Sequence, residues 1–182
     1  MQKQYMTIIN RVVFYMVIFS GIVTPVMAQH NTASVQNIKA VFLYNFTKYM
    51  KWSGLEQSST FNIAVIGESP ILDPLEQISL KRRVNQKAIQ IKHFENADQI
   101  NDSHILFIPE SKKTELNTIT DKIRKKNILI VSEIDGSLES GVMINILISQ
   151  ETVKFEINVR AMKKAGFQPG SELLKLAVRL IE

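Results

Sequence analysis

Three short runs of glutamate and serine come directly after apolar segments that are typical of buried strands. They are Gly67-Glu68-Ser69, Pro109-Glu110-Ser111 and Val131-Ser132-Glu133. The carboxyl ends of parallel strands meet at one edge of an open α/β sheet, and ligands bind there. The candidates for binding a small polar ligand are therefore Glu68, Ser69, Glu110, Ser111, Ser132 and Glu133. The other interpretation is structural, because serine at a helix start acts as a cap and glutamate beside it suits the helix dipole.

No other group of residues supports catalysis or metal binding. The histidines, His30, His93 and His104, have no helical i, i+4 spacing, and an ordinary place at a strand end is the simpler reading of His93 and His104. The sequence contains no HExxH, GxSxG, GxxxxGK[ST] or GxGxxG motif. Cysteine is absent, which excludes thiol chemistry and cysteine-based metal sites. We therefore expect no enzymatic activity, no cofactor and no bound metal.

Segments typical of strands alternate with segments typical of helices through most of the chain. The expected strands cover 61–67, 88–94, 104–109 and 128–132, and the expected helices cover 35–51, 70–78 and 111–126. This alternation favours a mostly parallel sheet that is covered by helices on both faces. The predicted fold class is therefore α/β.

The pattern changes after residue 140. The apolar run 141–148 and the alternating run 152–158 are separated by three polar residues, which predicts an antiparallel hairpin at the C-terminal side of the sheet. Asn158 is expected to cap a helix over 159–165. Ser171 is expected to cap a last helix, whose inward side chains are Leu173, Leu174, Ala177, Leu180 and Ile181. We expect residues 35–182 to form a single domain.

The first 28 residues have the pattern of a signal peptide. Lys3 and Arg11 precede the apolar run VVFYMVIFSGIV, and Val26 and Ala28 fit the small-residue cleavage site. A dozen apolar residues fall short of the roughly 20 that span a bilayer, so a retained anchor is the less favoured alternative. We expect cleavage after Ala28, export to the periplasm and no stable membrane anchor afterwards.

The charge of the chain does not favour nucleic acid as a partner. The formal net charge of +5 includes the two basic residues of the leader. The densest basic runs, Lys81-Arg82-Arg83 and Arg124-Lys125-Lys126, have no aromatic residues between the charges. Such runs are typical of solvated helix and loop ends.

Seven segments together resemble the YfiR family of bacterial periplasmic proteins. In order along the chain they are IKAVFLYNFTKYMKW, FNIAVIGES, RRVNQKAIQI, HILFIPES, ILIVSE, VKFEINVRAMKKAG and SELLKLA, and they cover nearly all of residues 36–180. The resemblance implies a repressor that binds the periplasmic sensor portion of an inner-membrane diguanylate cyclase and lowers cyclic-di-GMP synthesis. Release of the repressor would then favour biofilm formation. It also implies a homodimer with an α/β core.

The chain departs from the family pattern at its cysteines. Many relatives carry cysteine pairs that form redox-sensitive disulfides, and this chain has none. Redox sensing through thiols is therefore not available to it. The identity of the partner also stays open. The alternative function is that of a small-molecule sensor that uses the Glu/Ser loops and acts on a sensor histidine kinase or another membrane receptor.

The residues expected to contact the partner lie on two segments. On the strand 152–158, Lys154, Glu156 and Asn158 alternate with Val153, Phe155 and Ile157, and we expect the polar side to be exposed. Aromatic rings of the first helix region are expected to add to the interface, because such rings concentrate in protein contacts. The candidate partner-binding residues are Tyr44, Trp52, Phe155, Glu156, Asn158, Arg160 and Met162.

Overall fold

The computed structural model describes residues 27–149 and 152–182, and residues 33–182 form one compact unit. The expected leader lies outside the described residues, except for Met27 and Ala28, which begin helix α2 (Met27–Phe46). Among the helices that the structure describes, none combines the length and the apolar character needed to cross a bilayer.

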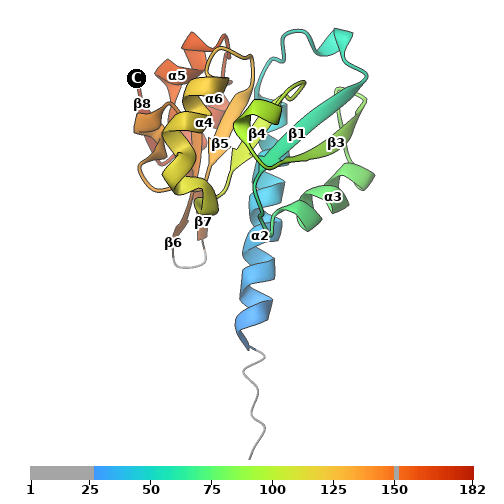
Figure 1. The fold of residues 1–182 in the computed structure, drawn as a ribbon, viewed down its shortest axis with the longest axis vertical. Helices are drawn as coiled ribbons and strands as arrows, with labels where there is room; N and C mark the ends of the chain where they lie inside the picture. The colour runs from blue at the N-terminus through green and yellow to red at the C-terminus, as the bar shows by residue number, and fades with distance from the viewer. Residues whose placement is uncertain (1–26, 150–151) are drawn as a thin grey trace, which may run out of the picture. The chain divides into compact units, whose positions relative to one another are not determined.

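An eight-stranded mixed sheet forms the centre of the unit, in the order β2-β3-β1-β4-β5-β6-β7-β8 (Figure 1). The strands are β1 (Thr60–Ile66), β2 (Arg83–Val84), β3 (Lys87–Phe94), β4 (Ile105–Ile108), β5 (Leu129–Ser132), β6 (Ile144–Ser149), β7 (Thr152–Asn158) and β8 (Arg179–Ile181). Strands β3, β1, β4, β5 and β6 are parallel to one another, and β6 and β7 form the expected antiparallel pair. The predicted α/β class and its antiparallel C-terminal hairpin are confirmed.

Two short edge strands differ from the sequence-based expectation. β2 pairs antiparallel with β3 across Asn85 and Gln86, whose φ angles of 47° and 68° suit a two-residue hairpin turn. β8 pairs parallel with β7 over residues that the sequence predicts as the end of the last helix. The expectation that Leu180 points inward is wrong, because its side chain lies on this edge strand and is 41% exposed.

Except for α3, which begins and ends later than expected, the described helices after α2 are shorter than the pattern suggests. They are α3 (Leu72–Lys81), α4 (Leu116–Ile123), α5 (Val159–Lys164) and α6 (Ser171–Leu176). The predicted helix over 111–126 divides into a 3₁₀ segment, Glu110–Glu115, followed by α4. Ser171 is the first residue of α6 rather than its cap, since Gly170 occupies the N-cap position.

Helices cover both faces of the sheet. The ring of Phe155 on β7 lies 5.9 Å from that of Phe42 and 5.2 Å from that of Phe46, so α2 packs on one face. Asn158 points to the opposite face by strand alternation, where it lines a pocket with Arg124 and residues of α5. Figure 1 accordingly shows α4 on the near side of the sheet and α2 on the far side.

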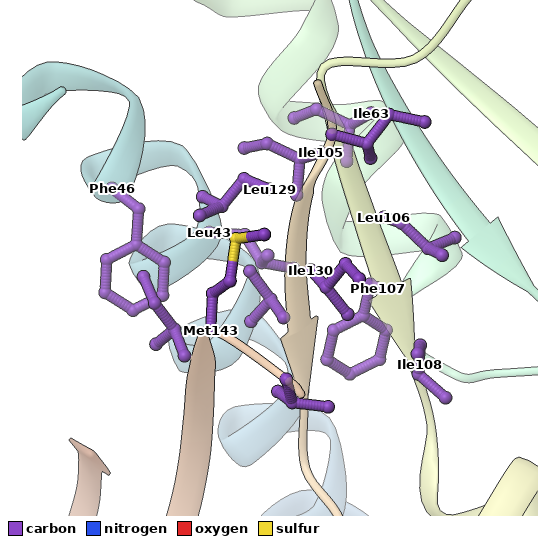
Figure 2. Packing of buried hydrophobic residues seen from close by; sticks show 14 of the residues in the cluster. Leu43, Phe46, Ile63, Ile105, Leu106, Phe107, Ile108, Leu129, Ile130 and Met143 are labelled. Carbon is purple, nitrogen blue, oxygen red and sulfur yellow. The ribbon is translucent and has the colours of Figure 1, made fainter. Parts of the chain in front are cut away.

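The core lies between α2 and the central strands. Figure 2 shows Leu43 and Phe46 of α2 on the side of the sheet to which Leu129 of β5 points. All three side chains are buried. Burying a large aliphatic or aromatic side chain contributes about 1.5–3 kcal/mol, so this contact is a main source of stability for a chain without disulfides.

The first helix ends earlier than expected, and this changes the place of Trp52. Helix α2 stops at Phe46 and is followed by a 3₁₀ turn, Thr47–Tyr49. The indole nitrogen of Trp52 donates to the Thr47 carbonyl at 2.9 Å, and its ring packs edge-on against Phe61 with centroids 4.8 Å apart. Trp52 is therefore a core residue rather than an exposed ring.

His104 closes the same end of the sheet. Its Nδ1 accepts a hydrogen bond from the Asn62 backbone N–H at 3.0 Å, and its ring stacks on Phe61 with centroids 4.6 Å apart. Burial lowers the pKa of His104 below its ordinary value of 6.5, although the nearby Asp102 carboxylate acts in the opposite direction. The folded protein therefore favours the neutral imidazole.

We predict that the protein loses stability as the pH falls through 6.5 toward the lower folded-state pKa of His104. The unfolded chain binds a proton at a higher pH than the folded chain, so the stabilisation is present above 6.5 and disappears below the folded-state value. Urea unfolding between about pH 8 and pH 5 measures this slope. In the variant His104→Asn, an amide oxygen replaces Nδ1 as acceptor, and the slope should flatten.

The matched control is His93→Gln, at an exposed histidine on β3. The change in slope caused by His104→Asn should exceed the change caused by this variant, because His104 is the more buried of the two side chains. An equal flattening in both variants, or in neither, would show that His104 does not set the pH dependence.

Candidate functional site

The Glu/Ser loops meet at the carboxyl edge of the parallel strands, as the sequence predicts. The Ser111 hydroxyl donates to the Glu68 carbonyl at 3.3 Å, which joins the loops after β4 and β1. The Glu110 backbone N–H donates to a Glu133 carboxylate oxygen at 3.2 Å, which joins the loops after β4 and β5.

The polar groups of these loops form hydrogen bonds and an ion pair within the protein. Ser132 Oγ accepts from the Ile134 N–H at 2.9 Å, and Ser69 Oγ accepts more weakly from the Ile71 N–H at 3.5 Å. The second carboxylate oxygen of Glu133 forms an ion pair with Lys39 of α2, whose side chain is only 4% exposed. Ser69, Ser132 and Glu133 therefore have structural contacts, but the expected capping by serine is wrong, because neither α3 nor the 3₁₀ segment Glu110–Glu115 has a side-chain cap. The small-ligand interpretation of this edge gains no support from its geometry.

The expectation of an exposed polar face on β7 holds for Lys154 but is wrong for Glu156 and Asn158. Glu156 and Asn158 are each only 5% exposed. Glu156 accepts from Asn145 Nδ2 at 3.2 Å and from Arg179 Nη1 at 3.2 Å. Asn158 caps α5, as predicted, by accepting from the Ala161 N–H at 2.8 Å. Strand β8 supplies Arg179 and covers this side of β7, which the sequence pattern did not reveal.

The other proposed contact residues divide by exposure. Met162 and Phe155 are buried, as is Trp52, so none of these side chains offers much surface to a partner. Arg160 is exposed, and Tyr44 is partly exposed. Tyr44 lies under Lys48, whose ammonium is 4.6 Å from the ring centre.

An open apolar groove between α2, β7 and α6 is the feature that the sequence did not reveal. We name it the α2–β7 groove; its lining residues are Phe42, Asn45, Phe46, Tyr49, Val153, Lys154, Phe155, Leu173 and Leu176. Its volume is about 280 Å³. Aromatic rings form much of its wall, and Lys154 is the only charged residue in the lining. Such a groove suits the apolar side chains of a polypeptide.

Several exposed apolar side chains lie on the elements of the groove or directly after α6. Leu176, at the end of α6, is 59% exposed and lines the groove itself. Ile38 and Val41 are exposed on α2, and Val178 is exposed two residues after Leu176. Exposed apolar surface beside an apolar groove is typical of a protein contact site.

One group of possible metal ligands lies apart from the groove. Glu68, His93 and Glu95 are all exposed, and one ligand atom from each lies within 4.8 Å of the others. The imidazole Nε2 is 3.9 Å from each carboxylate. Exposed carboxylates often adopt such arrangements without an ion, so we assign no metal to this group.

A comparison with protein families finds a match that covers most of the chain. A family model described as YfiR/HmsC-like matches residues 36–178. A search of curated proteins finds no match.

Two solved structures share the fold. A conserved domain protein from Vibrio cholerae O1 biovar El Tor has 8% identity over 80% of this chain and a TM-score of 0.57. An ABC domain from Streptococcus pneumoniae, in complex with L-Trp, has 14% identity over 82% of this chain and a TM-score of 0.54. The chain spans 60% of the length of each. At such low identity these likenesses concern the fold alone.

We predict that Lys39→Met destabilises the protein by about 3 kcal/mol, because it leaves the carboxylate of Glu133 without its buried cation. The double variant Lys39→Met/Glu133→Gln should recover at least half of this loss, since it removes both charges together. Urea unfolding at neutral pH measures the free energies.

Lys51→Met is the matched control, at an exposed lysine that makes no ion pair within residues 27–149 and 152–182. It should change stability by less than about 0.5 kcal/mol. A similarly small effect of Lys39→Met would mean that the pair with Glu133 contributes no more than a surface ion pair.

Proposed function

Because the chain belongs to the YfiR/HmsC-like family, we propose that it is a periplasmic repressor of a membrane-bound diguanylate cyclase. Family membership supports a regulatory role in cyclic-di-GMP signalling and a periplasmic location. In this proposal the protein binds the periplasmic sensor portion of the cyclase, so that cyclic-di-GMP synthesis falls and biofilm formation is held back. Cleavage of the leader after Ala28 and formation of a homodimer belong to the same proposal.

The α2–β7 groove is the observation that carries the binding part of this proposal. Three rings, Phe42, Phe46 and Tyr49, line it together with Leu173 and Leu176. A polypeptide that places apolar side chains there removes exposed apolar area from water, at about 25 cal/mol per Å². We therefore assign the groove, rather than the polar side of β7, as the contact site for the cyclase.

The partner-binding residues expected from the sequence have different roles if the groove is the contact site. Phe155 forms the floor of the groove, and Tyr44 and Arg160 remain accessible for contacts outside it. Glu156 and Asn158 act as supports, because Glu156 holds Arg179 of β8 and Asn158 holds the start of α5.

Repression follows from unequal affinity for two states of the cyclase. A partner shifts an equilibrium between active and inactive conformations only by the difference between its affinities for the two. A hundredfold shift requires about 2.7 kcal/mol. Full burial of one or two leucine-sized side chains contributes that much, so the groove is large enough for the task.

We predict that Leu176→Asp weakens binding to the periplasmic domain of the cyclase at least tenfold, or about 1.4 kcal/mol, because it places a carboxylate at the wall of an apolar groove. Cells carrying this variant should show higher cyclic-di-GMP. Isothermal titration calorimetry measures the binding, and a cyclic-di-GMP reporter measures the output. Leu176 is 59% exposed, so the change should leave the fold intact.

Leu80→Asp serves as the control, because Leu80 is 72% exposed on α3 and does not line the groove. Its affinity and its cyclic-di-GMP level should match those of the unaltered protein. Unchanged binding by a folded Leu176→Asp variant would rule out the groove as the contact site. Binding to the periplasmic domain of a sensor kinase, and to no cyclase, would replace the proposed partner.

A further inference from the structure

A second hollow lies on the face of the sheet opposite to α2. We name it the basic pocket; its lining residues are Arg124, Ile130, Leu138, Glu139, Gly141, Met143, Asn158, Arg160, Ala161, Lys164 and Ala165. Its volume is about 320 Å³, which falls at the small end of the range for ligand sites of roughly 300–1,000 Å³. It lies near the amino ends of β5 and β6, at the sheet edge opposite to the Glu/Ser loops.

The floor of the basic pocket is apolar and fixed by backbone hydrogen bonds. Ile130, Leu138 and Met143 are buried. The Met143 N–H donates to the Ile130 carbonyl at 3.0 Å, and the Asn158 N–H donates to the Met143 carbonyl at 2.9 Å. Three neighbouring strands therefore hold the floor in place. The partly exposed Ala161 and Ala165 lie in the same lining and offer apolar surface to a ligand.

The rim of the basic pocket carries positive charge. Arg160 and Lys164 are four residues apart on α5, so their side chains lie on the same side of the helix. Within residues 27–149 and 152–182, neither of them forms an ion pair. Like charges at this spacing repel each other, and an anion between them would relieve the repulsion.

The other charged groups in the lining already have partners. Arg124 lies 3.3 Å from Asp121, and Glu139 lies 3.3 Å from Arg179. The amide of Asn158 donates to the Leu138 carbonyl and accepts from the Ala161 N–H. Arg160 and Lys164 are therefore the basic groups of this lining that have no ion-pair partner within residues 27–149 and 152–182, and both are donors that suit a carboxylate.

We propose that the basic pocket binds a small organic carboxylate with an apolar body. The carboxylate lies between Arg160 and Lys164, and the apolar body rests against the partly exposed Ala161 and Ala165. This site is separate from the α2–β7 groove, since the two linings share no residue. It therefore adds small-molecule binding to the proposed repressor function and does not depend on it.

The test is a calorimetric titration of the protein, purified from the periplasm, with benzoate, its neutral analogue benzamide and inorganic phosphate. Benzoate should bind at least tenfold more tightly than benzamide, because only benzoate carries the charge. It should also bind more tightly than phosphate, because only benzoate has an apolar body. Equal affinity for benzoate and either of the other probes would overturn the proposal.

Two variants locate the binding. Arg160→Ala/Lys164→Ala should weaken benzoate at least tenfold. The matched control Lys163→Ala removes an exposed charge from the same helix outside the lining and should change the affinity less than twofold. Equal weakening by the control would indicate a general effect of net charge and would refute the site. Both variants change exposed positions, so both should fold, and circular dichroism tests this.

A polypeptide could supply the same chemistry through an aspartate side chain. A short peptide with blocked ends and one aspartate beside a phenylalanine distinguishes this source from a free acid. Weaker binding of the peptide than of benzoate supports a small-molecule site. Tighter binding of the peptide would refute the small-molecule assignment and identify the pocket as a contact for an acidic segment.

Discussion

Helix α2 is held on the sheet by two unlike contacts, and the arrangement of the molecule depends on both. At one place the ammonium of Lys39 pairs with Glu133 at the end of β5, where both side chains are largely removed from water. About one and two helical turns after Lys39, Phe42 and Phe46 pack edge-on against Phe155 of β7. A buried ion pair contributes little net stability, but breaking it is costly. The pair therefore selects one rotation of the helix, and the aromatic contact sets its distance from β7.

The α2–β7 groove is a result of this placement. If α2 turned about its axis, Lys39 would meet apolar strands and Leu43 would leave the core. With the helix fixed, the space between its outer side and β7 is not filled by the chain, and α6 closes it only in part through Leu173 and Leu176. The function that we propose thus rests on a constraint inside the protein rather than on the groove residues alone.

Much of the fold is visible in the sequence because it depends on local patterns. β4 and β5 are short apolar runs between polar loops, and every residue in them is buried. The sequence predicts Asn158 as a cap because its type and its place before a helical segment are a local signal. It does not predict β8, because these three residues gain strand structure only by pairing with β7, and a helical pattern runs through them.

The candidate site is harder to predict, because it depends on contacts between segments that lie far apart in the sequence. Alternation along β7 correctly separates Phe155 from Glu156, but it does not reveal that Asn145 and Arg179 cover the polar side. The α2–β7 groove brings together segments near residues 45, 154 and 174, which no local pattern connects. The convergence of the Glu/Ser loops could be predicted because the ends of parallel strands share an edge. The sequence does not show whether the polar groups of these loops remain free to bind a ligand.

The apolar α2–β7 groove and the basic pocket lie on opposite faces of strand β7, so only the thickness of one strand separates them. Val153 and Phe155 belong to the apolar groove, while Asn158, at the end of the same strand, belongs to the basic pocket. A displacement of this strand along its own axis would alter both sites at once, with no intervening relay of side chains. Its hydrogen bonds to β6 on one side and β8 on the other resist such sliding, so occupants of the two sites would sense each other only as far as those bonds yield.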